Sequence, residues 1–473
     1  MPIWRSPSLE AILGAPLDEV GLKEDVVKRL VEVGAQENEQ LDFKLNPQIS
    51  ESASGSEDTT KGWSSEQEFA KDICAFANHA GGVIFIGVRD EADVAVEARP
   101  TVVDPAALEQ RMRLALANFS APPPRFKLVA IEAELGDHYL ALVVPPSSSA
   151  PHAVRGPTGN ARRPLHYPVR DGAHTRWLLE HEVADRFRSR FSGRAELDTL
   201  RIAAVSAGLE ALSRAQEQLW LYVAIVPESP APQTLDRSSI AAMTEWWHEY
   251  GLISPLGRTL SKGGTPTPAP GRITISGAGA IEGQEETDPR YSYMEIYADG
   301  RAFAATPTSV NTTGKDSSII GERTLADDTV LLVDAGVSWA GHQAGSWGSA
   351  DVTIGLAHQG RSTGEFADPV ALHGHQSEGL RRIPGTRVVR GPIQARTTAD
   401  LQDSYNLLGR MNVVRDALTV LLHNFGVAET RQFEPDGTVV TWAWGGDDKV
   451  RAIEKWAKEY DLPVQNRHHS SWS

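Results

Sequence analysis

The chain has 473 residues, a formal net charge of -16 and a single cysteine, Cys74. Its length allows two or three domains with ordinary hydrophobic cores, and one cysteine excludes an internal disulfide framework. A negative balance this large excludes a general coat for duplex nucleic acid, which needs broad positive surface.

Membrane and secretory proteins are also disfavoured. No apolar run approaches the ~18 residues that a membrane-spanning helix requires. The amino terminus, MPIWRSPSLEAILG, lacks the charged start and apolar core of a signal peptide. We therefore expect a cytoplasmic protein that does not associate with a membrane.

The first elements surround an acidic motif. Residues 1–21 are expected to form a lead-in arm, 22–35 an amphipathic helix and 39–44 a strand. Alternation in that strand places Asp42 and Lys44 on one face. Glu37 has the wrong parity for a regular strand and can join Asp42 only from a turn or bulge. The polar residues 46–64 predict a mobile loop, either a plain insertion or a lid.

A helix, a glycine pair and an apolar strand follow. Ser65 and Glu68 form an S-x-x-E capping box for a helix that ends at Gly81-Gly82. The continuous apolar run 83–88 predicts a strand covered on both faces. Gly87 in this run allows a close backbone approach, and Asp90 lies two residues past the end of the run.

Further helices and strands complete an N-terminal domain of residues 22–192. A helix is predicted over 105–118 with Asp104 as its cap, then strands over 126–133 and 138–144. A hairpin over 166–170 and 174–178 and a closing helix over 179–191 follow.

Residues 193–473 predict a second domain, so that the whole chain is α+β. A strand near LWLYVAIVPES and a helix over 237–250 precede short alternating runs, among them TVLLVDAGVSWAG, that favour a largely antiparallel sheet. The longest helix is expected over 398–424, a last strand over 438–444 and a last helix over 448–460. The sequence leaves the role of this domain open between a sensor and an oligomerisation module.

Three stretches carry a resemblance to a known family. Residues 37–44 match E-x-x-x-x-D-F-K, residues 71–90 match K-D-I-x-A-F-A-N-x-x-G-G-V-I-x-I-G-V-x-D, and residues 167–175 match Y-x-x-R-x-G-x-x-T. Together they resemble the Schlafen-type divergent Alba (AlbA_2) domain, and this implies an Alba-like α/β fold for the N-terminal domain. The family pattern usually has Glu at the position of Asp42.

The resemblance implies a metal-dependent endoribonuclease that cleaves structured RNA such as tRNA, by analogy in prokaryotic defence or stress. In that reading Glu37, Asp42 and Asp90 bind Mg2+ or Mn2+, because hard cations take oxygen ligands. The metal activates a water for attack on the phosphodiester, and Lys44 stabilises the transition-state charge. No nucleotide cofactor is expected. A single Alba-type lobe forms half of the cleft of two-lobed members, which implies a homodimer or higher homo-oligomer.

A basic segment is the candidate surface for nucleic acid. From 155 to 170 the sequence has no acidic residue and four arginines, with Tyr167 interleaved; the arginines are Arg155, Arg162, Arg163 and Arg170. Guanidinium groups match phosphate geometry and an aromatic ring offers a stacking face. We therefore expect these residues to hold RNA or DNA.

Two other functions remain open at this stage. The same domain can act as a non-catalytic DNA- or RNA-binding regulator that uses the basic hairpin without turnover. Alternatively, the acidic surface can dock a protein partner, and such binding would persist in high salt.

Overall fold

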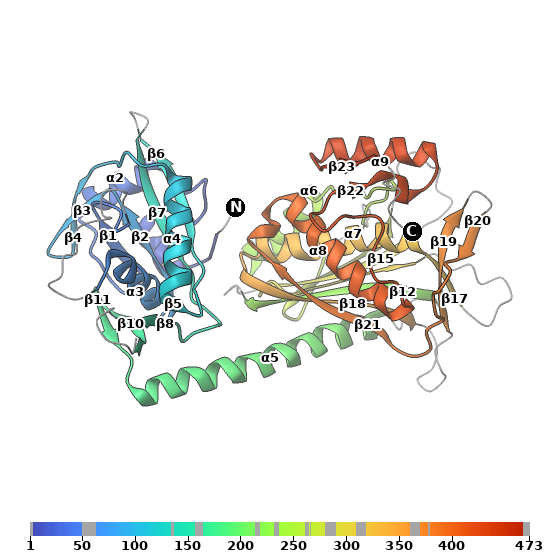
Figure 1. Ribbon diagram of the computed structural model, residues 1–473, viewed down its shortest axis with the longest axis horizontal. Coiled ribbons are helices and arrows are strands. Elements are labelled where there is room, and N and C mark those ends of the chain that lie inside the picture. Colours follow the sequence, from blue (N-terminus) through green and yellow to red (C-terminus); the bar gives the residue numbers. More distant parts are fainter. Residues whose placement is uncertain are drawn as a thin grey trace. The chain divides into compact units, whose positions relative to one another are not determined.

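The computed structural model describes residues 3–49, 63–133, 137–156, 164–212, 218–230, 236–260, 264, 266–279, 290–308, 318–359, 369–376 and 379–466. The chain divides into two compact units, unit 1 of residues 1–196 and unit 2 of residues 197–473 (Figure 1). Both contain helices and strands, which confirms the predicted α+β class. No helix in the described ranges is long and apolar enough to span a membrane.

A four-stranded sheet forms the centre of unit 1, in the order β1 (Leu41–Lys44), β2 (Gly82–Ile86), β7 (His138–Val144) and β6 (Lys127–Glu132). β1 runs parallel to β2, and the other neighbours are antiparallel. Helices α3 (Ser65–Ala77) and α4 (Pro105–Phe119) pack their apolar residues against one face. Every residue of β2 is buried, as its continuous apolar run predicted.

Smaller elements lie around this sheet. They are the hairpin of β3 (Val88–Glu91) and β4 (Val94–Ala98), the three-stranded sheet of β5 (Ser120–Ala121), β8 (Ala153–Arg155) and β9 (Leu165–His166), and the hairpin of β10 (Pro168–Asp171) and β11 (His174–Trp177). Gly87, between β2 and β3, has φ +97°, and a Cβ there would lie 2.9 Å from the Arg99 carbonyl oxygen. The predicted close backbone approach is therefore confirmed.

The first residues pack into unit 1 rather than forming an arm. The Ile3 amide donates to the Leu17 carbonyl at 2.7 Å, and the side chains of Leu9 and Leu13, on α1 (Pro7–Leu13), are buried. The helix predicted over 22–35 is α2 (Glu24–Glu32). Within the predicted loop 46–64, residues 50–62 lie outside the described ranges.

The N-cap of helix α3 lies one residue before the predicted cap, Ser65. Ser64 is the N-cap: its hydroxyl accepts from the Gln67 amide, and the Gln67 side chain accepts from the Ser64 amide. The sequence fits S-x-x-Q and S-x-x-E in adjacent registers. Gln67 decides between them, because its buried side-chain amide also donates to the carbonyls of Arg155 and Gly156.

The helix predicted to close the N-terminal domain at 191 is longer. Helix α5 (Glu180–Leu212) continues through the boundary between the two units. No glycine or proline with helix-ending geometry stops it, since Gly193 is accommodated within the helix with open space beside it. Its last residues, including Val205 and Leu212, belong to a core of unit 2.

Unit 2 is built on an antiparallel sheet of seven strands, which confirms the predicted sheet. Their order is β13 (Thr267–Ala269), β14 (Arg272–Gly279), β15 (Arg290–Tyr297), β16 (Ala302–Pro307), β12 (Gln218–Ser229), β18 (Trp347–Gln359) and β21 (Ile393–Asp400). Along β12, Leu219, Leu221 and Val223 face the main core. The alternate residues Trp220 and Tyr222 pack with the end of α5.

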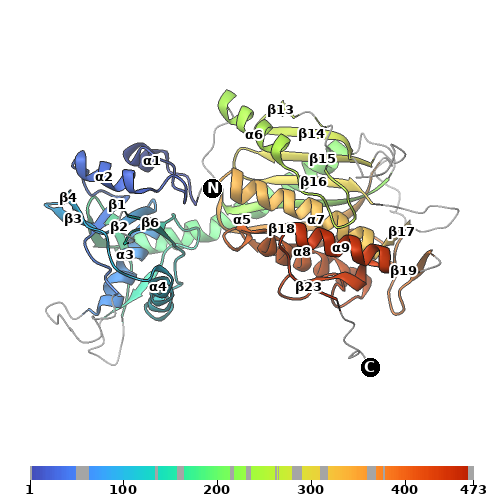
Figure 2. The same ribbon diagram turned by 90° about the horizontal axis from the view of Figure 1, so that it is seen from above.

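Helices α6 (Arg237–Glu249), α7 (Glu322–Ser338) and α8 (Leu407–Leu422) contribute to the main core (Figure 2). A small sheet of β17 (Ser318–Gly321), β19 (Val370–Gln376) and β20 (Gly379–Arg382) adjoins α7. The last elements are β22 (Val439–Val440), α9 (Asp447–Glu459) and β23 (Val464–Gln465).

Three predictions for unit 2 were wrong. The run 329–341 is not a strand but lies in α7 and the π-helical turn Trp339–Gln343, because short apolar runs fit a helix buried on all sides equally well. The helix predicted over 398–424 as the longest of the chain begins only at Leu407, and α5 is longer than this helix. The predicted strand 438–444 is the two-residue β22 followed by a 3-10 turn.

Candidate nucleic-acid-binding domain and its acidic site

The acidic motif folds back on itself at the start of β1. Asn38 shapes the turn: its amide donates to the Leu41 carbonyl at 3.0 Å, and its side-chain oxygen accepts from the Gln40 amide at 2.8 Å. Glu37 thereby returns to β1, where its carboxyl accepts from the Phe43 amide at 2.8 Å and hydrogen-bonds with Asp42. A turn therefore brings Glu37 to Asp42, as the alternation of side chains along the strand required.

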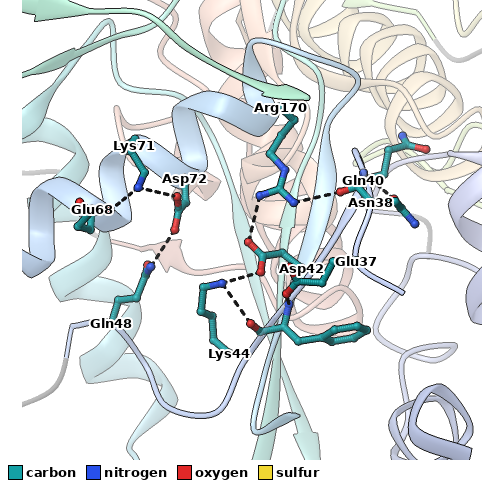
Figure 3. Close-up of polar contacts among 11 residues, drawn as sticks. Glu37, Asn38, Gln40, Asp42, Lys44, Gln48, Glu68, Lys71, Asp72 and Arg170 are labelled. Carbon is teal, nitrogen blue, oxygen red and sulfur yellow. Dashed lines mark hydrogen bonds and ion pairs between the residues drawn. The ribbon is translucent and has the colours of Figure 1, made fainter. Parts of the chain in front are cut away.

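Two cations hold Asp42 inside the domain (Figure 3). Asp42 is buried, with only 2% of the residue exposed. Lys44 Nζ donates to its Oδ1 at 2.6 Å, and Arg170 Nη1 donates to its Oδ2 at 3.3 Å. Both carboxylate oxygens of Asp42 thus already face a positive charge.

These contacts set opposite protonation states for the two acids. Burial, the hydrogen bond with Asp42 and the charge of Asp42 together raise the pKa of Glu37 to about 8. Burial also acts to raise the pKa of Asp42, but the charge of Lys44 and the hydrogen bond from Glu37 outweigh it and hold that pKa below its usual range. Near neutral pH, Glu37 is therefore a neutral donor and Asp42 an ionised acceptor.

The third predicted acid lies on a neighbouring hairpin. The Glu37 amide donates to the Asp93 carbonyl at 2.8 Å, so the β3–β4 hairpin adjoins the segment that carries Glu37. Asp90 itself is exposed on β3, next to a bulge between Arg89 and Asp90. The structure therefore brings the backbones close but leaves the Asp90 side chain in solvent, whereas Asp42 is buried.

The three acids do not fit the predicted Mg2+ or Mn2+ site. Over the described parts of the chain, no three His, Cys, Asp or Glu side chains lie together so that they could hold a metal ion. A hard cation requires ionised oxygens that are free to coordinate. Asp42 is already neutralised by Lys44 and Arg170, Glu37 carries a proton near neutral pH, and the Asp90 side chain is exposed.

A second buried acid, which the sequence did not single out, lies beside this pair. Asp72 of α3 is 7% exposed and accepts from the Gln48 side-chain amide at 2.8 Å. Burial raises its pKa, while Lys71 and the charge of Lys44 act to lower it. In the sequence, this acid is simply the residue after Lys71 on a helix with an apolar face. Nothing in that pattern indicates that its side chain is buried.

The predicted phosphate-binding residues separate into different environments. Arg155 is exposed at the end of β8. Arg162 and Arg163 lie outside the described residues. Arg170 was wrongly placed on the surface: it is 4% exposed, donates to the Asn38 carbonyl at 3.0 Å and lies over the Phe76 ring at 4.6 Å. Its guanidinium lies in the interior because the buried carboxylate of Asp42 needs an opposite charge there.

Tyr167 is half-buried and packs edge-on against Phe187 at 6.2 Å between ring centroids. The hairpin nevertheless carries aromatic rings that remain accessible. Trp177 is 41% exposed, and it contacts both Trp63 and His166. Only the position of Trp63 at the end of a polar loop could have indicated this cluster from the sequence.

Asn78 connects the hairpin to the helix. This buried side chain donates to the carbonyls of His152 and Pro168, each at 2.8 Å, and accepts from the His152 amide at 2.6 Å. Through it, the end of α3 fixes both β8 and β10.

Comparisons with known proteins place the N-terminal domain in context. No curated protein matches the sequence. The solved structures that match include the DIP2311 protein of Corynebacterium diphtheriae, at 18% identity and TM-score 0.22, over 35% of this chain and 28% of that one. Another is the N-terminal domain of a Nitrosomonas europaea protein described as related to the ATP-dependent DNA helicase RecG, at 18% identity and TM-score 0.21, over 33% of this chain and 94% of that one.

TM-scores this low do not establish a shared fold. The aligned part also spans less than a third of the Corynebacterium protein. The family comparison is more specific: residues 37–178 match the family described as Schlafen, AlbA_2. This range contains β1, α3, β2 and the β10–β11 hairpin, which carry the three motifs. The N-terminal part of the chain therefore belongs with the Schlafen AlbA_2 domains, as its motifs predicted.

Proposed function

We propose that unit 1 is a nucleic-acid-binding domain that acts without metal-dependent hydrolysis at its acid pair. The observation that carries the proposal is the AlbA_2 match over residues 37–178. Arg155, exposed within a segment that has no acidic residue from 155 to 170, supplies a phosphate contact. Binding is favoured over hydrolysis because Asp42 is neutralised by Lys44 and Arg170.

The test measures binding of the full chain to fluorescently labelled RNA and DNA by anisotropy. We expect saturable binding that weakens as salt increases, since phosphate contacts release counterions. Arg155→Ala should weaken it. Arg113→Ala is the matched control, because Arg113 is exposed on α4 and paired with Glu109 at 2.6 Å. Absence of binding to either nucleic acid, or equal losses in both variants, would overturn the proposal.

The second candidate is the metal-dependent endoribonuclease that the resemblance implies, with tRNA as the first substrate to test and a defence or stress role by analogy. It is favoured by the hydrogen bond between Glu37 and Asp42 and by the hairpin of Asp90 beside them. It also implies a homodimer, which light scattering measures directly. For this activity Glu37 must lose its proton and Asp42 must exchange a cation for the metal.

A cleavage assay separates the two candidates. The full chain is incubated with tRNA and Mn2+, with Mg2+, or with a chelator, alongside Asp90→Ala and the neighbouring Asp93→Ala as a control. We expect binding without cleavage. Metal-dependent cleavage that Asp90→Ala abolishes and Asp93→Ala retains would establish the endoribonuclease instead. Binding in high salt to a protein partner, with no affinity for nucleic acid, would favour an interaction module.

A further inference from the structure

Three aromatic rings form a cluster at one end of unit 1, here called the aromatic trio: Trp63, His166 and Trp177. Trp63 and Trp177 stack with ring centroids 5.6 Å apart and planes 22° apart. His166 lies 5.2 Å from Trp177 and 5.7 Å from Trp63. Trp63 lies just before the N-cap of α3, His166 lies on β9 and Trp177 ends β11.

The scaffold holds this cluster in place from several directions. Gln67 donates to the carbonyls of Arg155 and Gly156, which anchors the end of β8 to the first turn of α3. Opposite β8, His166 is fixed by its register with Val154. Trp177 is fixed by its pairing with Pro168 in the β10–β11 hairpin. Rings positioned in advance bind a planar ligand with little additional loss of conformational entropy.

The trio is open to solvent, and an exposed arginine lies on the strand that neighbours β9. Trp177 is 41% exposed, and Trp63 and His166 are only half-buried. Arg155 is exposed at the end of β8 and follows Val154, the register partner of His166, so its side chain leaves the β8–β9 pair on the face opposite His166. A protein core would bury such rings, whereas a ligand with a flat apolar face and an adjacent phosphate would use both features. An unpaired nucleotide has this combination.

We propose that the aromatic trio is a stacking site for an unpaired base of single-stranded nucleic acid, with Arg155 contacting the adjacent phosphate. The inference rests on the proposed nucleic-acid binding and extends it to a substrate class: strands or loops with unstacked bases, in preference to continuous duplex. In a duplex the bases stack on one another and expose only their edges. Trp177 could therefore stack on a base only after that base had unpaired.

The test compares a labelled oligouridine single strand with a hairpin-free duplex of similar length, using the full chain and anisotropy. We expect the wild type to bind the single strand more tightly. Trp177→Ala should weaken single-strand binding by about tenfold, the effect of losing one stacked base, and leave duplex binding unchanged. Trp177→Phe, which keeps a stacking ring, should restore most of the affinity. Quenching of tryptophan fluorescence on titration with the unlabelled single strand gives a second readout, which should be diminished in Trp177→Ala.

Phe191→Ala is the matched control, because Phe191 is also an exposed aromatic residue of unit 1 but lies outside the trio, on α5. It should leave both affinities unchanged. Thermal melting of each variant identifies any loss of folding, and Trp177→Phe remains informative if Trp177→Ala unfolds. No binding to any nucleic acid would refute the proposed function itself. Binding with equal affinity for the two oligomers, or a Trp177→Phe variant as weak as Trp177→Ala, would refute only the stacking site.

Discussion

At the scale of single residues, the acidic site resembles a balanced interior network more than a set of metal ligands. Its carboxylates are Asp42, Asp72 and Glu68, and its cations are Lys44, Lys71 and Arg170. The charges of these three carboxylates and three cations sum to zero. Glu37 lies beside them and leaves that sum unchanged only if it is neutral, and its raised pKa keeps it protonated near neutral pH. Burial of charge is tolerated because each group has an opposite partner.

Arg170 should therefore be a stabilising residue, not a binding residue. Arg170→Ala leaves the buried Asp42 with only one cation and removes the contact with Phe76, so we expect a loss of about 3 kcal/mol in the stability of unit 1. Amide hydrogen exchange of unit 1 peptides measures it. Arg155→Ala, which removes an exposed arginine, should change stability by less than about 0.5 kcal/mol. Equal stability of the two variants would show that Asp42 does not depend on Arg170.

The proton on Glu37 makes a second prediction, on pH. Its pKa is about 8 in the folded chain against 4.5 as the ordinary value. Between these values the folded state holds a proton that the unfolded state has lost, so this carboxyl reduces stability as pH rises from about 4.5 to 8. In Glu37→Gln this dependence disappears, while the Gln side chain still accepts from the Phe43 amide and can donate to Asp42.

We expect Glu37→Gln and the wild type to have equal stability near pH 4.5 and the variant to be more stable at pH 8. The difference should be about 2 kcal/mol, less than the full shift implies, because Glu37 is only half-buried and solvent screens its charge. Urea unfolding at several pH values measures it. Parallel profiles for the two proteins would mean that Glu37 is ionised in the folded state.

The residue-scale features differ in how far the sequence predicts them. The Glu37–Asp42 contact followed from strand parity, which required a turn, and Asn38 supplies that turn. The burial of Arg170 did not follow, because its partner Asp42 lies 128 residues earlier. A motif fixes spacing along the hairpin but not which side of it meets the core.

At the scale of elements, α3 is the piece that positions both sites. Its first turn anchors β8 through Gln67, and its end anchors β8 and β10 through Asn78. The cap that starts this helix should therefore contribute to the stability of unit 1. Ser64→Ala removes the acceptor for the Gln67 amide and should cost about 1 kcal/mol.

Ser65→Ala is the matched control for this cap, because Ser65 is the first helical residue and Ser64 is the observed N-cap. It should be neutral within about 0.5 kcal/mol, since alanine is at least as favourable in a helix. Thermal unfolding of the two variants decides the register. A larger loss in Ser65→Ala would favour the cap that the S-x-x-E pattern suggested.

Helix α7 shows why unit 2 was harder to predict. Its buried residues include the acids Asp327, Asp328 and Asp334. Arg258 pairs with the first two and Arg410 pairs with Asp334 at 2.6 Å. These partners lie 69 to 76 residues away in sequence, so the local pattern showed only an apolar run with scattered acids. Tertiary pairing, rather than local propensity, makes this segment a buried helix.

At the scale of the whole molecule, charge limits how nucleic acid can bind. A chain with a net charge of -16 repels phosphate over most of its surface, so attraction must come from a local group of cations and from uncharged contacts. The two units have separate cores, and the AlbA_2 match is confined to the first. Stacking on the aromatic trio does not depend on net charge, which makes it compatible with an acidic protein.

The salt dependence of binding tests this division between charge and stacking. For single strands, the slope of log K against log salt is about -0.7 for each phosphate contact. We expect a shallow slope, because few cations take part. Arg155→Ala should lower its magnitude by about 0.7, the loss of one contact. Trp177→Ala should weaken binding at every salt concentration and leave the slope unchanged, because a stacked ring releases no counterion. Arg113→Ala, which removes a positive charge from α4, should retain the wild-type slope. A steep slope that responds equally to all three substitutions would indicate diffuse electrostatic attraction instead of a defined site.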